Sequence, residues 1–245
     1  MPDIVITPWH RRRLREVYRS AGWPCLDTVE IELLAAGLLE RVRGPLGHET
    51  LRVTDAGLVL VAETLQRNRA QRSAHERLVE RVARAMTRAG RIAWRGLSLR
   101  ARVGEAWAMA MPDVFSIRHT TVEAYLAPVV HEIKVSRADL LSDLRSATKR
   151  AAYLALSSEC WYVIREGIAT PDEIPPDCGV MVATGDANAD IAEGTLDVAR
   201  PAPKRAMQMP FGLWMALARA TPLEGWRLED AQGQLGDTAG FPPES

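Results

Sequence analysis

The sequence predicts an α/β protein, or α+β when the chain is taken as a whole. Helices are expected to flank a mixed β-sheet, and a smaller helical module is expected to precede it. Residues 129–136 (VVHEIKVS) alternate apolar and polar side chains, the period of a strand that has one face in a core. The runs 160–164 (CWYVI) and 179–183 (GVMVA) are typical of short buried strands. An amphipathic helix is expected between the first two of these strands, which makes it a long crossover connection in the sheet.

The composition is that of an ordinary globular protein of one large domain or two smaller ones, with 245 residues, 47% apolar and 25% charged. No apolar run approaches the length of a membrane span, and the first residues lack the order of a signal peptide. Three widely spaced cysteines and five scattered histidines indicate neither a disulfide framework nor a zinc site. We therefore expect a cytoplasmic protein without a membrane partner.

The net charge of zero hides an asymmetry along the chain. Residues 1–103 hold 19 arginines and 11 carboxylates, a net charge of +8, and residues 104–245 carry the opposite excess. Of the 31 basic residues 28 are arginine, which binds phosphate in a bidentate fashion. This pattern favours a nucleic-acid-binding module followed by an acidic, metal-binding one. An arginine-rich genome would explain the choice of arginine over lysine, but not the polarity.

Residues 1–70 are expected to form the first module. Thr7 and Pro8 predict a helix start, and Asp27 or Thr28 predicts a second one. The expected elements are a helix over 9–20 with Leu14, Val17 and Tyr18 as its apolar stripe, a helix over 28–42, two short strands over 41–52 and a helix that begins at 54–57. This order resembles that of a winged helix-turn-helix domain.

Such a module can bind DNA or another protein, and the sequence leaves both open. Glu30, Glu32 and Glu40 on the expected recognition helix argue against close reading of bases along its length. If the module binds DNA, its candidate phosphate contacts are Arg11, Arg12, Arg13, Arg41, Arg43 and Arg52.

A bridging helix is expected over residues 64–90, with Ser73 as a plausible cap. Its predicted apolar stripe is Ala74, Leu78, Val82, Ala85 and Ala89. Glu76 and Glu80 fall opposite that stripe. Either could add a carboxylate to a metal site, but a solvated pair between Glu80 and Arg84, four residues apart, is the favoured interpretation.

The candidate chemistry centres on Glu132 and Lys134, which leave the same face of the strand at 129–136. A carboxylate beside an ammonium suits a metal-bound phosphate, and Asp113, after Pro112, offers a second oxygen ligand. The alternative is an ordinary cross-strand charge pair and an ordinary Pro-Asp turn.

The crossover helix is expected to begin at the capping sequence Ser136-x-x-Asp139 and to run to about Ser157. Opposite its apolar stripe, Lys149 and Tyr153 form one ridge at positions i and i+4, which can lean over the strand that carries Glu132. The predicted stripe is Leu140, Leu141, Leu144, Ala147, Ala151 and Ala155.

Taken together, the run PDVF…VVHEIKVSRADLLSDL…KRAAY…CWYVI…DEIPPDCGVMVA resembles the PD-(D/E)XK nuclease superfamily, and within it the MmcB-type DNA repair proteins. The resemblance covers about residues 105–220 and implies a restriction-endonuclease-like domain over 71–222. A winged helix lies outside the usual span of that family, so its presence here is a departure. The remaining residues, 223–245, are expected to form a flexible tail.

The resemblance implies a Mg²⁺- or Mn²⁺-dependent DNA endonuclease that acts in repair. The metal ligands would be Asp113, Glu132 and the carbonyl of Ile133, with Lys134 orienting the attacking water and Lys149 and Tyr153 contacting phosphate. The DNA can be single-stranded, duplex or branched, and a homodimer is possible. The competing hypotheses are a non-catalytic DNA-binding regulator with a nuclease-like domain, and an enzyme that acts on RNA.

Overall fold

The computed structural model describes residues 4–185 and 194–223. The chain divides into two compact units, Met1–Arg72 and Ser73–Ser245, and the division falls inside a helix. The tail expected over 223–245 lies, except for Leu223, outside the described residues. Within the described part of the chain, no helix combines the length and the apolar character needed to cross a membrane.

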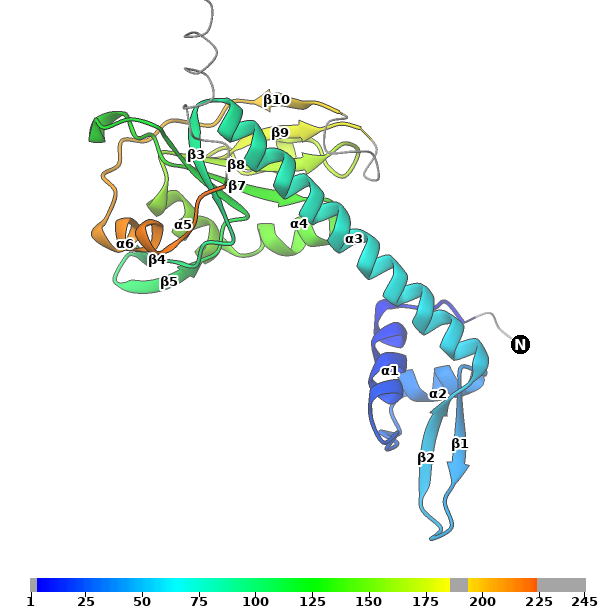
Figure 1. Cartoon of the computed structure of the whole chain (residues 1–245). Coiled ribbons are helices and arrows are strands. Elements are labelled where there is room, and N and C mark those ends of the chain that lie inside the picture. The colour runs from blue at the N-terminus through cyan, green and yellow to red at the C-terminus, as the bar shows by residue number, and fades with distance from the viewer. Residues whose placement is uncertain (1–3, 186–193, 224–245) are drawn as a thin grey trace, which may run out of the picture. The chain divides into compact units, whose positions relative to one another are not determined.

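The first unit has the predicted order of helix, helix, β-ribbon and helix (Figure 1). Its elements are α1 (Pro8–Arg19), α2 (Thr28–Ala35), β1 (Leu39–Arg43), β2 (Glu49–Val53) and the first part of α3 (Asp55–Arg88). Thr7 caps α1 as predicted, and its main-chain N–H in turn donates to His10 Nδ1. The core of the unit is made by Leu14, Val17, Leu33, Leu39, Leu51 and Val61.

Two predictions for this unit are wrong. The second helix was expected to reach residue 42 but ends at Ala35, because Gly37 adopts a left-handed conformation (φ +68°) and Leu38 N–H bonds back to the Leu33 carbonyl. The chain then enters β1, where pairing with β2 buries Leu39. Tyr18, expected in the apolar stripe of α1, is 57% exposed.

The helix α3 is continuous over 34 residues, so the predicted new start at Ser73 is also wrong. Its sequence has no glycine or proline between residues 58 and 89, so nothing interrupts the main-chain hydrogen bonds. The Ser73 hydroxyl instead accepts a hydrogen bond from Arg77. Gly90, at φ +74°, follows the end of the helix.

The second unit contains a six-stranded mixed sheet in the order β10-β9-β8-β7-β6-β3. The strands β7, β8 and β9 are parallel, whereas the other neighbours pair antiparallel. The expected α+β class with a mixed sheet is therefore confirmed, and β10 is a strand that the sequence pattern did not predict. The strands are β3 (Arg91–Arg95), β6 (Val114–Arg118), β7 (Val129–Lys134), β8 (Glu159–Arg165), β9 (Gly179–Ala183) and β10 (Leu196–Arg200).

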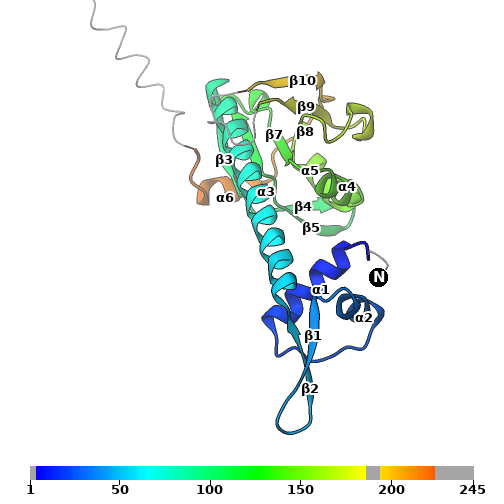
Figure 2. The same cartoon turned by 90° about the vertical axis from the view of Figure 1, so that its right-hand side faces the viewer.

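Helices cover both faces of this sheet (Figure 1 and Figure 2). On one face α3 packs Leu78 and Val82 against Ile133 and Val163. The other face carries α4 (Arg137–Leu144), α5 (Ala147–Leu156), α6 (Phe211–Arg219) and the hairpin of β4 (Leu99–Val103) and β5 (Ala106–Ala110). All six residues of β7 are therefore buried, which corrects the expectation that only one face of this strand lies in a core.

The crossover helix expected up to Ser157 is two helices, α4 and α5. They are separated at Arg145–Ser146, where Ser146 leaves the helical conformation (ψ 77°). The break changes the buried face, so that α5 buries Ala152, Tyr153 and Leu156 rather than the predicted alanines. Tyr153, expected on the polar ridge opposite the apolar stripe, is fully buried.

Candidate active site

The antiparallel pairing of β6 with β7 brings Asp113 next to Glu132. The register matches Val114 with His131, so the residue before β6 lies opposite the next residue of β7. Asp113 Oδ2 accepts a hydrogen bond of 2.7 Å from the N–H of Ile133. Burial and then the negative charge of Asp113 raise the pKa of Glu132. Two like charges are thus held close together, an arrangement that a bound cation stabilises.

The main chain of Ile133 adds a third oxygen at this point. Its N–H faces Asp113, and in a strand the N–H and C=O of one residue point toward the same neighbour. Its side chain packs in the core beneath α3, away from Glu132. Nowhere in the described residues do three His, Cys, Asp or Glu side chains gather to hold a metal. The protein ligands of a metal here would be two carboxylates and one carbonyl, and a Mg²⁺ ion would fill its other positions with waters and substrate oxygens.

Glu132 is the centre of a buried hydrogen-bond network. Its Oε1 accepts from Lys134 Nζ at 2.8 Å and from Lys149 Nζ at 2.6 Å, and its Oε2 accepts from the Tyr153 hydroxyl at 2.9 Å. Glu132 is 2% exposed and Lys134 is 4% exposed. The structure thus brings Lys149 and Tyr153, from α5, onto the strand that carries Glu132 and Lys134, as the ridge at i and i+4 predicted.

Two aspartates of α4, which the sequence analysis left out of the site, complete the network. Lys134 Nζ lies 3.3 Å from Asp139 and 3.5 Å from Asp143. Asp143 also accepts from Tyr162 at 2.8 Å. The signal in the sequence was their spacing, because residues four apart share one face of a helix.

The charges of this network set its protonation. Burial alone lowers the pKa of Lys134, but the carboxylates of Glu132, Asp143 and Asp139 outweigh it and raise that pKa. Burial alone raises the pKa of Asp143, but hydrogen bonds from Lys149 and Tyr162 and the charge of Lys134 lower it. Lys134 is therefore a cation and Asp143 an anion at neutral pH.

The residue that α3 contributes is His75, which the sequence analysis also missed. Its Nε2 lies 3.4 Å from Asp113 Oδ2. His75 is half-buried and lies on the same helix face as the buried residues Leu78, Val79 and Val82. The buried stripe of α3 therefore includes Val79, which the predicted stripe did not. This spacing of i, i+3, i+4 and i+7 was present in the sequence.

The two glutamates proposed for the site lie elsewhere on α3. Glu80 forms ion pairs with Arg84, at 2.6 Å, and with Arg95. The predicted pair at i and i+4 is therefore present. Glu76 is exposed, and within the described chain it has no hydrogen bond or ion pair.

We expect His75 to make stability depend on pH. The interaction with the Asp113 carboxylate raises the pKa of His75 above 6.5, against the opposing effect of burial. The stabilisation is fully present below 6.5 and is lost as the pH rises through the higher pKa of the folded state. Urea unfolding between about pH 6 and 9 should therefore show a falling free energy of unfolding that His75→Gln lacks.

The control for this prediction is His48→Gln, in the other unit, which should keep the wild-type dependence of the free energy of unfolding on pH. Burial lowers the pKa of His131 to about 3, so His131 does not make the free energy of unfolding fall as the pH rises above 6.5. Equal slopes in the wild type and His75→Gln would contradict the pairing of His75 with Asp113.

The six arginines proposed as phosphate contacts of the first unit already have protein partners. Arg11 donates to the Thr64 hydroxyl at 3.0 Å, and the other five lie within ion-pair distance of a carboxylate. A phosphate at these positions would compete with those partners. The five pairs are Arg12 with Glu16, Arg13 with Asp27, Arg41 and Arg43 with Glu49, and Arg52 with Glu40.

An exposed surface rich in arginine and apolar side chains lies on the hairpin that leads into the site. Arg100 pairs with Met109 and Arg102 with Trp107, so these four side chains share one face of the hairpin. The Arg100 guanidinium lies 5.6 Å from the centre of the Trp107 ring, and Trp107 is 64% exposed. From β5 the chain continues through Met111 and Pro112 directly to Asp113.

No family model matches the sequence, and comparisons with curated proteins and with solved structures find no match either.

Proposed function

We propose that this protein is a Mg²⁺- or Mn²⁺-dependent nuclease that hydrolyses phosphodiester bonds in DNA during repair or processing. The observation that carries the proposal is the cluster at the end of β7, where Asp113 and Glu132 lie side by side and Lys134 donates to Glu132. The resemblance of the surrounding sequence to PD-(D/E)XK nucleases supports the same function.

Each residue of the cluster has a role in this proposal. Asp113, Glu132 and the Ile133 carbonyl would hold the metal, which supplies positive charge to the phosphate and makes a bound water more acidic. Lys134, positively charged at neutral pH, donates to the attacking water or to a phosphate oxygen. Lys149 and Tyr153 orient the Glu132 carboxylate, and His75 orients that of Asp113.

DNA is the proposed substrate, and single strands the preferred form. The hairpin beside Asp113 exposes Trp107 together with Arg100 and Arg102. An aromatic ring stacks on the unpaired bases of a single strand, while arginines contact its phosphates. The winged-helix-like order of the first unit suits a second contact with DNA, in which phosphates would compete with the present partners of its arginines.

A non-catalytic DNA-binding protein is the second candidate. The observation in its favour is that both oxygens of Glu132 already accept hydrogen bonds, two of them from lysines. A buried network that is satisfied in this way can serve a structural role alone.

Cleavage of labelled single-stranded, duplex and branched DNA in Mn²⁺ distinguishes the two candidates. We expect the wild type to cut, with single strands cut fastest, and Lys134→Met to cut about 10²–10³-fold more slowly because it lacks the cation beside the phosphate. Arg88→Met, which removes an exposed cation at the end of α3, is the control and should cut like the wild type.

Equal cutting by the wild type and Lys134→Met would contradict the catalytic role of Lys134 and indicate a contaminating nuclease. If neither protein cuts but both retard DNA in a gel, the non-catalytic candidate replaces the nuclease.

A further inference from the structure

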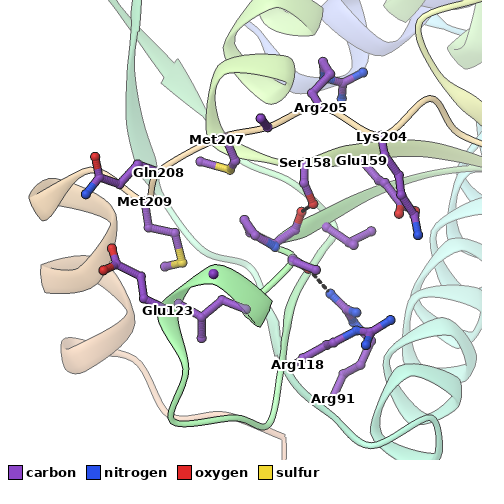
Figure 3. A pocket seen from close by; sticks show the side chains of 16 residues that line it. Arg91, Arg118, Glu123, Ser158, Glu159, Lys204, Arg205, Met207, Gln208 and Met209 are labelled. Carbon is purple, nitrogen blue, oxygen red and sulfur yellow. Dashed lines mark hydrogen bonds between the residues drawn. The ribbon is translucent and has the colours of Figure 1, made fainter.

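A cavity of about 670 Å³ lies at the opposite end of β6 and β7 from the candidate active site (Figure 3). Its walls come from β3, the end of β6, residues 123–128, the start of β7, the start of β8 and residues 204–209. Val129, in its wall, is five residues from Lys134, which corresponds to about 16 Å along a strand. The volume is in the range of small-molecule sites, which is about 300–1,000 Å³.

Two arginines face each other across neighbouring strands in this cavity. Arg91 of β3 is the register partner of Arg118 of β6, so both side chains leave the same face of the sheet. Like charges in directly opposite positions destabilise a sheet. Burial, and next the charge of Arg118, lower the pKa of Arg91 to about 10. The pair is therefore held at a cost in stability that a bound anion would offset.

The guanidinium of Arg91 is fixed in place by the protein. Its Nε donates to the Ser116 hydroxyl at 2.8 Å, and its Nη2 donates to the carbonyls of Ser116 and Ala127. No described hydrogen bond uses its Nη1. In the described part of the chain neither Arg118 nor Lys204 has an ion-pair partner.

The acidic residues of the cavity offset its positive charge only in part, since the charge of Glu159 opposes the lowering of the pKa of Arg91. Glu159 accepts a hydrogen bond of 3.0 Å from the Trp161 indole, and Glu123 is exposed. Four cationic and two acidic side chains line the cavity, so its net charge is +2. Arg205 is one of the four cations, but its guanidinium donates to the Asp177 carbonyl. Its main-chain N–H donates to the Ser158 carbonyl and so fixes residues 204–209 beside the start of β8.

The other end of the cavity carries two methionines, together with Gln208 and Glu123. Figure 3 shows Met207 and Met209 on one side, while Arg91, Arg118 and Lys204 gather on the other. Methionine sulfur makes favourable contacts with aromatic rings. A ligand that fits both ends has a strongly anionic group joined to a flat ring system.

We propose that this cavity binds the phosphomonoester of a nucleoside. The phosphate would lie between Arg91, Arg118 and Lys204, and the base would contact Met207 and Met209. Arginine pairs bind phosphate in this way through charge-assisted hydrogen bonds. A free nucleotide and the 5′-phosphorylated end of a DNA strand both supply this chemistry. The proposal does not depend on the nuclease activity.

Calorimetric titration with deoxyadenosine monophosphate tests the site. We expect binding to the wild type, and binding of unphosphorylated deoxyadenosine that is weaker by about 10-fold or more. Arg118→Gln and Lys204→Gln should each lose about 10-fold or more in affinity, since each removes a charged donor. Arg165→Gln, an exposed arginine at the end of β8, is the control and should bind like the wild type.

Two further measurements test the repulsion between the two arginines and the independence of this cavity from the candidate active site. Without ligand, Arg118→Gln should raise Tm, because it removes the repulsion on Arg91. Asp113→Asn should bind the nucleotide with the affinity of the wild type, because Asp113 does not line the cavity. A failure of the nuclease proposal would then leave the nucleotide-binding proposal unaffected.

Competition by 5′-phosphorylated and unphosphorylated oligonucleotides identifies the source of the ligand. Displacement of the nucleotide by the phosphorylated strand alone supports a DNA end, and displacement by neither supports a free nucleotide. Absence of nucleotide binding to the wild type, or wild-type affinity in both Arg118→Gln and Lys204→Gln, would overturn the proposal.

Discussion

Replacement of Asp113 by asparagine is expected to reduce DNA cleavage by about 10²–10³-fold while the chain stays folded. The amide oxygen of asparagine can still accept the hydrogen bond that Ile133 N–H donates to Asp113 in the wild type. What is lost is the negative charge beside Glu132, on which the binding of a divalent cation depends. The measurement is the single-turnover rate with labelled DNA in Mn²⁺, together with Tm.

Glu80→Gln is the matched control, because Glu80 is another partly buried carboxylate of the same unit, paired with Arg84 and Arg95. It should cleave at the wild-type rate. Wild-type cleavage by Asp113→Asn would remove Asp113 from the proposed metal site. An equal loss in both variants would show a general sensitivity to the loss of a carboxylate. Titration with Mn²⁺ should separately show weaker binding to Asp113→Asn than to Glu80→Gln.

Glu132→Leu is expected to lower the free energy of unfolding by about 3–5 kcal/mol. The wild-type carboxylate accepts from Lys134 and Lys149, and the side chain of Lys134 is only 6% exposed. Loss of the carboxylate leaves buried positive charge with fewer partners, and it leaves the Tyr153 hydroxyl with only the Met111 carbonyl. Urea unfolding at pH 7 measures the loss.

The double variant Glu132→Leu/Lys134→Met should recover most of that stability. An apolar pair of similar volume often replaces a buried ion pair without loss, because the desolvation of both charges is avoided. Lys149 keeps Asp143 as its partner in this variant. We expect a folded protein with no cleavage, which would mean that the pair serves chemistry rather than stability. A double variant as unstable as Glu132→Leu would contradict this.

The sequence by itself determined the features that depend on one element. The cap at Thr7, the order of elements in the first unit, the strand at 129–134 and the shared face of Glu132 and Lys134 follow from capping chemistry and from the period of two. The ends of the helices did not follow from the sequence pattern. The main chain leaves the helical conformation at Gly37 and at Ser146, although the apolar pattern continues past both residues. Asp113 was a candidate only through the Pro-Asp dipeptide and the resemblance, since no local period links it to Glu132.

Only the tertiary structure decided which elements meet. The register of β6 on β7 places Asp113 against Ile133, and the packing of α3 on the sheet brings His75 rather than Glu76 to that carboxylate. The pairing of β3 with β6 sets Arg91 opposite Arg118, 27 positions apart in the chain. Contacts between such distant residues depend on strand register and on how helices pack on both faces of the sheet. Neither can be read from the periodicity of a single segment of sequence.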